Sequence, residues 1–211
     1  MEEEIYIKDL IHRYPKLTVI KSQLLDGYQI LKECYENGGK LLIAGNGGSA
    51  ADAEHIAGEL MKRFRKARPV SEEFAEKLKK VDPQIGVELA ANLECSLMAI
   101  PLVAHEALTT AYINDVDGYG VFAQQLFGYG RPGDVFLGIS TSGNSANILN
   151  AAVVARAIGI KVLGLTGRDG GKLAEMSDVS VIVPEKETYL IQELHLPIYH
   201  CWCMMLEEHF F

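Results

Sequence analysis

Two kinds of apolar segment alternate along most of this chain. Five short apolar runs are candidate strands, at 41–44, 97–103, 135–139, 162–165 and 179–183. Several are unbroken, which is typical of strands buried on both faces of a parallel sheet. Apolar residues at spacings of three and four predict helices between them, at 49–64, 104–128 in two pieces, 145–158, 171–176 and 187–209. The alternation predicts an α/β fold with a doubly wound, five-stranded parallel sheet.

Two segments lie outside this alternation. Residues 2–37 have helical spacing, and Pro15 is expected to divide them into two helices. Residues 65–94 carry a charged helical pattern and predict a helical insertion between the first two strands. We expect a single domain over residues 1–211. We also expect the N-terminal helices to serve in oligomerisation, because their apolar faces and that of the last helix exceed what one sheet can cover.

Composition and charge narrow the classes of function. The chain has 211 residues, 48% of them hydrophobic, which is enough for a sizeable core. A net charge of -8 argues against a general nucleic-acid binder or a protein that coats anionic membranes. No apolar stretch approaches the ~18–20 residues that span a bilayer. The acidic start at 2–4 has the wrong charge for a signal peptide, and the cysteines lack CxxC spacing, so we expect reduced thiols in a cytoplasmic protein.

The first loop with candidate chemistry is Gly45-Asn46-Gly47-Gly48-Ser49, between the first strand and a helix. Glycines allow backbone N–H groups to turn toward an anion, and the helix dipole adds partial positive charge there. The spacing is neither a dinucleotide fingerprint nor a P-loop. Taken alone, the glycines could equally serve the geometry of the turn.

The second loop is Ser140-Thr141-Ser142-Gly143-Asn144-Ser145, directly after the third strand. Ser145 is a plausible helix N-cap, but capping explains one hydroxyl and not four. A neutral, hydroxyl-rich loop suits a phosphate monoester, and its place after the third strand puts it with the first loop at the switch point of a doubly wound sheet. No GxSxG motif surrounds the serines, so they are not expected to be nucleophiles.

Further candidates lie on two helices and in one basic patch. His55 and Glu59 share a helix face at i,i+4 spacing. They are either an exposed helix pair or part of a metal or catalytic site whose other residues come from elsewhere in the chain. The last helix offers Gln192, Glu193, His195 and His200. Its geometry does not choose among them, and His200 could be a core histidine. The basic residues Lys62, Arg63, Arg65, Lys66 and Arg68 form either a solvated helix end or an anion-binding patch.

Together these motifs resemble the phosphoheptose isomerases, which are sugar isomerase (SIS) domain proteins. The resemblance rests on GNGGS at 45–49, STSGNS at 140–145, LTG at 165–167, GGK at 170–172, and IQE at 191–193 with His195 and His200. It implies a homotetramer of single SIS domains with zinc commonly bound at the active site. It also implies interconversion of sedoheptulose 7-phosphate and D-glycero-D-manno-heptose 7-phosphate through an enediol, the first step of nucleotide-activated heptose biosynthesis.

The resemblance assigns roles residue by residue. It implies that the sugar phosphate is contacted by Asn46, Gly47, Gly48, Ser49, Asn114, Asp115, Ser140, Thr141, Ser142 and Ser145. It further implies that His55, Glu59, Gln192 and His200 ligate one zinc ion per subunit, with Glu59 and Gln192 also touching substrate. Glu59 and His200 become the acid/base candidates, a role that competes with ligation. The chain departs from the family by about twenty extra residues within 65–94 and by Tyr189, where Asp is common.

Two relatives of the same fold are alternatives. A non-catalytic SIS protein that binds the bacterial replication initiator carries Asn at the position of His200 and Arg at that of Gly143, so this chain favours the enzyme. An SIS enzyme or regulator for hexose phosphates is less compatible with the pair Gln192 and His200. We therefore expect a cytoplasmic isomerase whose partners are a sugar phosphate and copies of itself, with no nucleic acid and no membrane.

Overall fold

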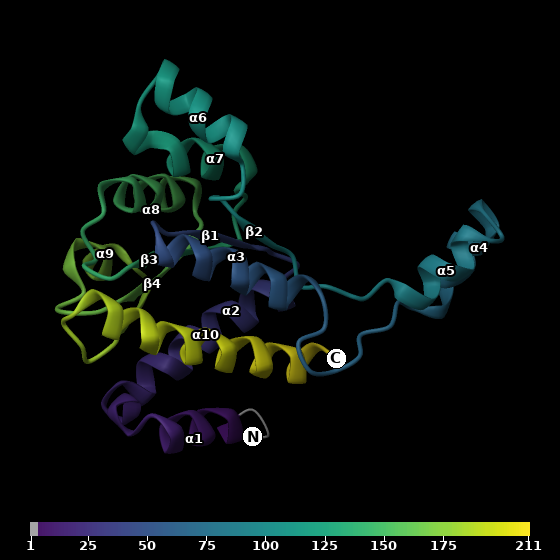
Figure 1. The fold of residues 1–211 in the computed structure, drawn as a ribbon, viewed down its shortest axis with the longest axis horizontal. Coiled ribbons are helices and arrows are strands. Elements are labelled where there is room, and N and C mark those ends of the chain that lie inside the picture. Colours follow the sequence, from purple (N-terminus) through teal and green to yellow (C-terminus); the bar gives the residue numbers. More distant parts are fainter. Residues whose placement is uncertain (1–3) are drawn as a thin grey trace.

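A parallel sheet lies between two layers of helices in the computed structural model, which describes residues 4–211 (Figure 1). Its strands are β1 (Leu41–Ala44), β2 (Ala99–Pro101), β3 (Val135–Ser140), β4 (Lys161–Thr166) and β5 (Val179–Ile182). The order is β2-β1-β3-β4-β5, and every neighbouring pair is parallel. The predicted five-stranded parallel fold is therefore confirmed. Because strand order reverses between β1 and β3, ligands are expected at their carboxyl ends.

The two faces of the sheet are covered by different sets of helices. One face carries α1 (Glu4–Arg13), η1 (Pro15–Ile20), α2 (Lys21–Glu36), α3 (Gly48–Met61) and α10 (Thr188–Phe210). The other carries α6 (Glu106–Asp115), η2 (Gly118–Gly120), α7 (Val121–Tyr129), α8 (Ala146–Ile158) and α9 (Gly171–Met176). Successive strand residues point to opposite faces. Leu41 and Ile43 accordingly join the first core, and Leu42 and Ala44 join the second.

The N-terminal helices pack on the chain's own last helix. Pro15 begins η1, which separates α1 from α2. Ile7, Leu10 and Leu24 are buried in the core beneath α10. Much of the apolar face of these helices is thus covered within one chain. None of the helices described is both long and apolar enough to cross a membrane.

Residues 65–94 form an arm that extends away from the body of the molecule (Figure 1). Its helices are α4 (Glu72–Val81) and α5 (Ile85–Asn92), which pack chiefly on each other. Gly86 is the one buried residue of the two helices. Large apolar side chains remain exposed on this arm, at Phe74, Val81, Ile85, Val87, Leu89 and Leu93. Helices this short depend on packing for most of their stability, and here each packs chiefly on the other.

Candidate active site

The strand order brings the two candidate loops side by side. β1 and β3 are hydrogen-bonded neighbours, so the loops after Ala44 and Ser140 emerge at the same edge of the sheet. Asn46 in the first loop and Asn147 in the first turn of α8 exchange two amide hydrogen bonds, of 3.0 and 2.9 Å. This reciprocal pair joins the loops into one cradle, and the sequence alone did not identify Asn147.

Both helices that begin at this cradle have N-termini without a side-chain cap. α3 begins at Gly48 and α8 at Ala146, and no side chain accepts a cap hydrogen bond at either end. Ser145 stands at the predicted N-cap position, but its Oγ lies 2.9 Å from Ser140 Oγ instead. The N-cap position predicted for Ser145 is therefore confirmed, and only the side-chain cap hydrogen bond is not made. In the first turn of α3, Ser49 and Ala50 donate to the backbone carbonyls of Asn46 and Gly47, and the positive end of each helix dipole favours an anion at the cradle.

The hydroxyl-rich loop is fixed in shape by the loop that follows β4. Gly143 has φ +64°, and a Cβ at this position would overlap the carbonyl oxygen of Gly170. The amide of Asn144 donates to the Ser142 carbonyl at 2.8 Å and accepts from the Lys172 N–H at 3.2 Å. Only glycine fits at position 143 without displacing the loop that follows β4.

Gln192 connects the last helix to the cradle. A Cβ at Gly48 would lie 2.6 Å from Gln192 Nε2, so this amide rests on the first turn of α3. Glu193, the neighbour that helical geometry had left as an alternative, is exposed. Because α3 and α10 pack together, the helix face that carries Gln192 is the one that faces the cradle.

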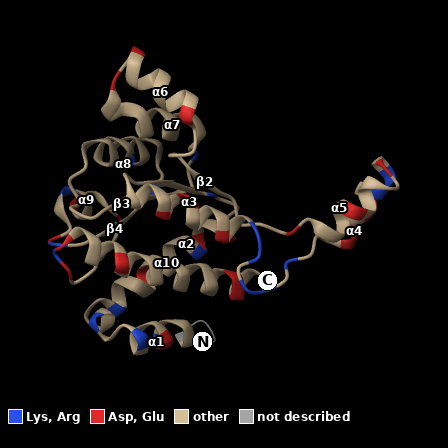
Figure 2. Cartoon of the chain, viewed as in Figure 1, with Lys and Arg blue, Asp and Glu red and all other residues tan. Residues whose placement is uncertain are grey.

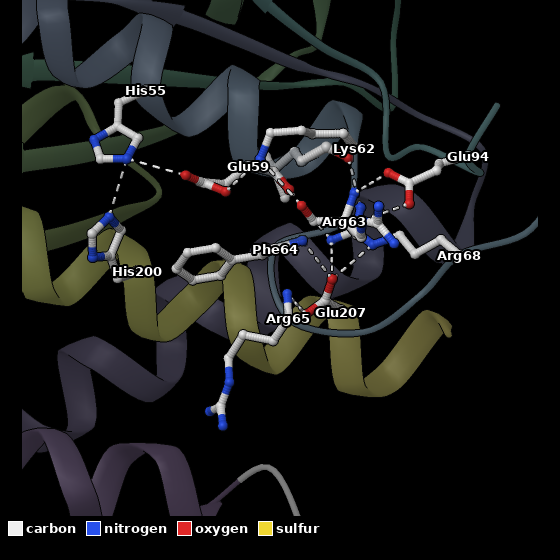
Figure 3. A network of polar contacts seen from close by, with 11 residues as sticks. His55, Glu59, Lys62, Arg63, Phe64, Arg65, Arg68, Glu94, His200 and Glu207 are labelled. Atoms are coloured by element: carbon white, nitrogen blue, oxygen red, sulfur yellow. Dashed lines mark hydrogen bonds and ion pairs between the residues drawn. The ribbon is translucent and has the colours of Figure 1, made fainter. Parts of the chain in front are cut away.

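His55, Glu59 and His200 form a cluster where α3 crosses α10 (Figure 3). His55 Nε2 lies 3.2 Å from Glu59 Oε1 and 3.4 Å from His200 Nε2. The His200 ring also packs against Phe64, with ring centroids 5.3 Å apart. Burial, with a smaller contribution from His55, lowers the pKa of His200, which keeps this imidazole neutral and able to accept a proton.

A zinc ion can be tested against this cluster through donor type and spacing. Zinc takes nitrogen and oxygen donors at ~2.0–2.1 Å, which places tetrahedral neighbours ~3.3 Å apart. The two separations from His55 Nε2, to Glu59 and to His200, match that spacing. In the described part of the chain, no three His, Cys, Asp or Glu side chains surround one point closely enough to hold a metal as they stand. The donors fit zinc in kind and in two separations.

Two residues that the sequence analysis missed contact this cluster. The Tyr199 hydroxyl lies 3.1 Å from both Asp52 Oδ1 and His55 Nδ1. Asp52 stands three residues before His55 on the same helix, which is a spacing that could have drawn attention to it. Nothing in the sequence pattern distinguishes Tyr199 from the apolar residues around it.

Three of the sequence candidates lie elsewhere. His195 is fully buried, its Nε2 lies 3.2 Å from the Thr166 carbonyl, and burial lowers its pKa to about 4, so it is a neutral core histidine. Asn114 and Asp115 end α6, on the opposite face of the sheet from α10. The Asn114 amide donates to Asp115 at 2.8 Å, and α6 packs chiefly on α7 and η2. Within one chain, this pair is not brought to the cluster.

The basic patch at 62–68 is largely neutralised by carboxylates (Figures 2 and 3). Its ion pairs are Lys62 with Glu59, Arg63 with Glu94, Lys66 with Glu208 and Arg68 with Glu207. Arg68 is 1% exposed. The patch therefore divides in two: Lys62, Arg63 and Arg65 are exposed at the end of α3, as expected of a solvated helix end. Lys66 and Arg68 instead hold the base of the arm to the last helix.

Comparison with known proteins identifies relatives over nearly the whole chain. A family model of the SIS domain matches residues 6–88 and 87–167. The phosphoheptose isomerase of Aneurinibacillus thermoaerophilus is 42% identical over 179 residues, covering 85% of this chain and 77% of the relative. That of Helicobacter hepaticus is 39% identical over 193 residues, covering 92% and 85%.

Solved structures agree with these relatives. The phosphoheptose isomerase from Neisseria gonorrhoeae superposes with a TM-score of 0.72 at 33% identity, covering 98% of this chain and 94% of that one. The enzyme from Francisella tularensis gives 0.76 at 29% identity, with coverage of 97% and 96%. The match therefore extends over the cradle, the histidine cluster and both layers of helices.

Proposed function

This chain belongs to the phosphoheptose isomerases of the SIS-domain family and is therefore an aldose–ketose isomerase. We propose that it interconverts sedoheptulose 7-phosphate and D-glycero-D-manno-heptose 7-phosphate. In this proposal it performs the first step of nucleotide-activated heptose biosynthesis in the cytoplasm.

The observation that carries the proposal is the placing of the cradle and the histidine cluster along the same pair of helices. Gly48 and Gln192 meet at one end of the α3–α10 contact, and His55 and His200 meet at the other. The seven residues from Gly48 to His55 span about 10 Å at 1.5 Å per helical residue. An extended seven-carbon sugar phosphate can reach from one end to the other, with phosphate in the cradle and C1 and C2 beside the cluster.

The phosphate end is bound by neutral donors. The N-termini of α3 and α8 contribute partial positive charge, and Ser140, Ser142 and Ser145 offer hydroxyls. A local site of this kind is necessary, because the net charge of -8 repels an anion at long range. The cradle thus fixes the substrate and leaves its carbonyl end free to react.

The carbonyl end needs a base that removes a proton from the carbon beside the carbonyl and an acid that returns it to the neighbouring carbon. Glu59 and His200 flank His55 and are the two groups of the cluster suited to these roles. His200 is neutral, because burial lowers its pKa, so it can accept the proton. The imidazolium formed on His200 then returns that proton to the neighbouring carbon. Glu59, held on its other oxygen by Lys62 at 3.2 Å, is the alternative carrier for the same proton.

Zinc is part of the proposal. His55, Glu59, Gln192 and His200 would hold it, and as a Lewis acid it would stabilise the enediolate oxygens. The support is the donor spacing at His55, whose Nε2 lies close to both Glu59 and His200. Gln192, which contacts the first turn of α3 at Gly48, enters the proposed ligand set through the resemblance to the family. Ligation and proton transfer compete at His200, since a ligated imidazole is a poor base.

Gly143 and His200 support an enzyme over the non-catalytic relative that binds the replication initiator. That relative carries Arg at the position of Gly143, but in this chain a side chain there would overlap the Gly170 carbonyl. His200 lies in the cluster, where Asn would supply no base at neutral pH. Both positions therefore favour turnover.

We also propose a homotetramer. Its support is the exposed apolar surface of the arm, including Phe74 and Ile85, together with Ile113 and Val116 at the end of α6. Exposed apolar side chains that lie together mark interaction sites, and we assign this one to copies of the same chain.

The test is turnover. The purified protein is incubated with sedoheptulose 7-phosphate in deuterated water, and sedoheptulose and fructose 6-phosphate serve as comparison substrates. We expect conversion of the heptose phosphate with deuterium incorporated beside the carbonyl, and at least tenfold lower kcat/KM for both comparison substrates. No turnover of any sugar phosphate would overturn the enzyme assignment, and preference for the hexose phosphate would overturn the substrate.

A further inference from the structure

The hydroxyl of Tyr199 lies between a carboxylate and the imidazole of His55. It donates a hydrogen bond to Asp52 Oδ1 at 3.1 Å, and His55 Nδ1 lies 3.1 Å from the hydroxyl oxygen of Tyr199. Tyr199 is 1% exposed, and the second oxygen of Asp52 is buried without a hydrogen-bond partner. Three polar groups from two helices are thus placed in a row on the side of His55 away from Glu59.

The direction of the hydrogen bonds in this row follows from the number of protons. A carboxylate can only accept, and a phenol has a single hydrogen to donate. Since that hydrogen goes to Asp52, the oxygen of Tyr199 can only accept from His55. Nδ1 of His55 must therefore carry the proton in this hydrogen bond, which fixes the tautomer of the neutral ring.

The consequence lies on the other side of the ring. With Nδ1 protonated, Nε2 of neutral His55 holds a lone pair, and this is the atom that lies 3.2 Å from Glu59 Oε1 and 3.4 Å from His200 Nε2. In the other tautomer Nε2 would carry a proton and donate it to Glu59. A ring nitrogen needs its lone pair to bind a metal ion, and partners of the opposite nitrogen commonly secure it.

We propose that Tyr199 and Asp52 are positioning residues that hold His55 in its Nδ1–H tautomer with Nε2 directed at the site. The inference rests on the proposed function for its effect on turnover, but not for the tautomer itself. It differs from a packing role, in which the Tyr199 ring would matter through its edge contacts with His55 and His200, at 5.5 and 5.0 Å between centroids.

The test separates the hydroxyl from the ring. Tyr199→Phe keeps the ring and removes the hydroxyl. Asp52→Ala keeps Tyr199 and removes the acceptor, so that the phenol is free to donate to Nδ1 and reverse the tautomer. Tyr35→Phe is the matched control, because Tyr35 is a buried tyrosine whose hydroxyl donates to the Met98 carbonyl at 3.2 Å, far from the cluster.

The readout is the ring nitrogen spectrum of ¹⁵N-histidine-labelled, metal-free protein at about pH 8.5, above the ordinary imidazole pKa of ~6.5. We expect Nδ1–H for His55 in the wild type and in Tyr35→Phe, and a majority of Nε2–H in Tyr199→Phe and Asp52→Ala. Zinc affinity, measured by competition with a chelator, should fall ~10- to 100-fold in both site variants and stay within twofold in the control.

The possible results are distinct. If Tyr199→Phe does not fold, Asp52→Ala decides the question alone. Retention of Nδ1–H in either folded site variant, with zinc affinity within twofold of the wild type, would overturn the proposal and leave Tyr199 as a packing residue. If the wild type turned over no heptose phosphate but the tautomer shifted as expected, the proposed function would fail while this inference stood.

Discussion

Arg68 and Glu207 form an ion pair almost wholly removed from water, with Nη2 2.8 Å from Oε1 and side-chain exposures of 0% and 2%. Glu207 also accepts the backbone N–H groups of Phe64 and Arg65, at 2.8 Å each. Burial would raise the pKa of Glu207, but these N–H donors and Arg68 together lower it. Since Arg68 Nη2 also donates to the Glu59 carbonyl at 3.3 Å, the pair joins the arm, the last helix and the site (Figure 3).

Removing one member of this pair is expected to be severe. Arg68→Met leaves the Glu207 carboxylate buried without its counter-ion, so the free energy of unfolding should fall by about 3–5 kcal/mol. The control is Lys77→Met, which breaks an exposed i,i+4 pair with Glu73 and should cost less than ~0.5 kcal/mol. Urea unfolding measures both, and equal losses in the two variants would show that the buried pair is not important for stability.

His200→Asn should abolish turnover and leave the fold intact. His200 is partly exposed and its polar partner is His55, so its loss leaves little unsatisfied in the core. We expect kcat to fall by at least ~100-fold, as for a lost acid/base or ligand group, with the melting temperature near that of the wild type.

His195→Asn is the matched control for that variant. His195 is fully buried against Thr166, so the change should cost ~1–3 kcal/mol of stability while activity per folded molecule stays near normal. If His200→Asn lost stability but kept its activity, while His195→Asn lost activity, His200 would not belong to the active site.

Ser142→Ala should weaken phosphate binding. The change removes a neutral hydrogen bond to a charged oxygen, worth ~1.5–3 kcal/mol, or about 10- to 100-fold in affinity. Calorimetric titration with the sugar phosphate gives the value. Ser180→Ala, whose hydroxyl donates to the Ala174 carbonyl outside the cradle, should bind as the wild type does. If Ser142→Ala bound the sugar phosphate within twofold of the wild-type affinity, the loop would have only a structural role.

Stability should fall with acid because of His195. Burial lowers its pKa to about 4, while the unfolded chain has an imidazole pKa of ~6.5, so the unfolded state binds more protons between these values. The histidine's contribution is complete above pH ~6.5 and is lost as pH falls toward 4, by about 3 kcal/mol in all. His195→Leu should remove that part of the pH dependence, as measured by urea unfolding across this range. Parallel curves for the two proteins would contradict the burial of a neutral histidine.

The arm should take part in assembly. Light scattering of the wild type is expected to give four chains of 23.2 kDa each. Phe74→Ser combined with Ile85→Ser makes exposed apolar positions of the arm polar, at 45% and 57% exposure, and should yield smaller species. Val153→Ser, 55% exposed on α8, serves as the control and should remain a tetramer. A wild-type monomer would refute the tetramer, and a tetrameric double variant would place the interface elsewhere.

The elements of this fold could be predicted from the sequence because their signals are local. Strands buried on both faces require unbroken apolar runs, and those at 41–44 and 135–139 became β1 and β3. The alternation of strands and helices requires parallel pairing, and that placed both glycine- and hydroxyl-rich loops at one edge of the sheet. The cradle was therefore predictable from the sequence, down to most of its residues.

The partners of individual side chains were decided by tertiary structure. Helical periodicity gives the face of a residue but not the rotation of the helix that packs against it. The sequence therefore left Gln192 and Glu193 equivalent, and only the contact with Gly48 distinguished them. Ser145 found a hydroxyl in place of the N–H it was expected to cap. Arg68 met Glu207, and Tyr199 met Asp52, across 139 and 147 residues of sequence, because packing of the last helix brings them together and no local pattern records such an approach.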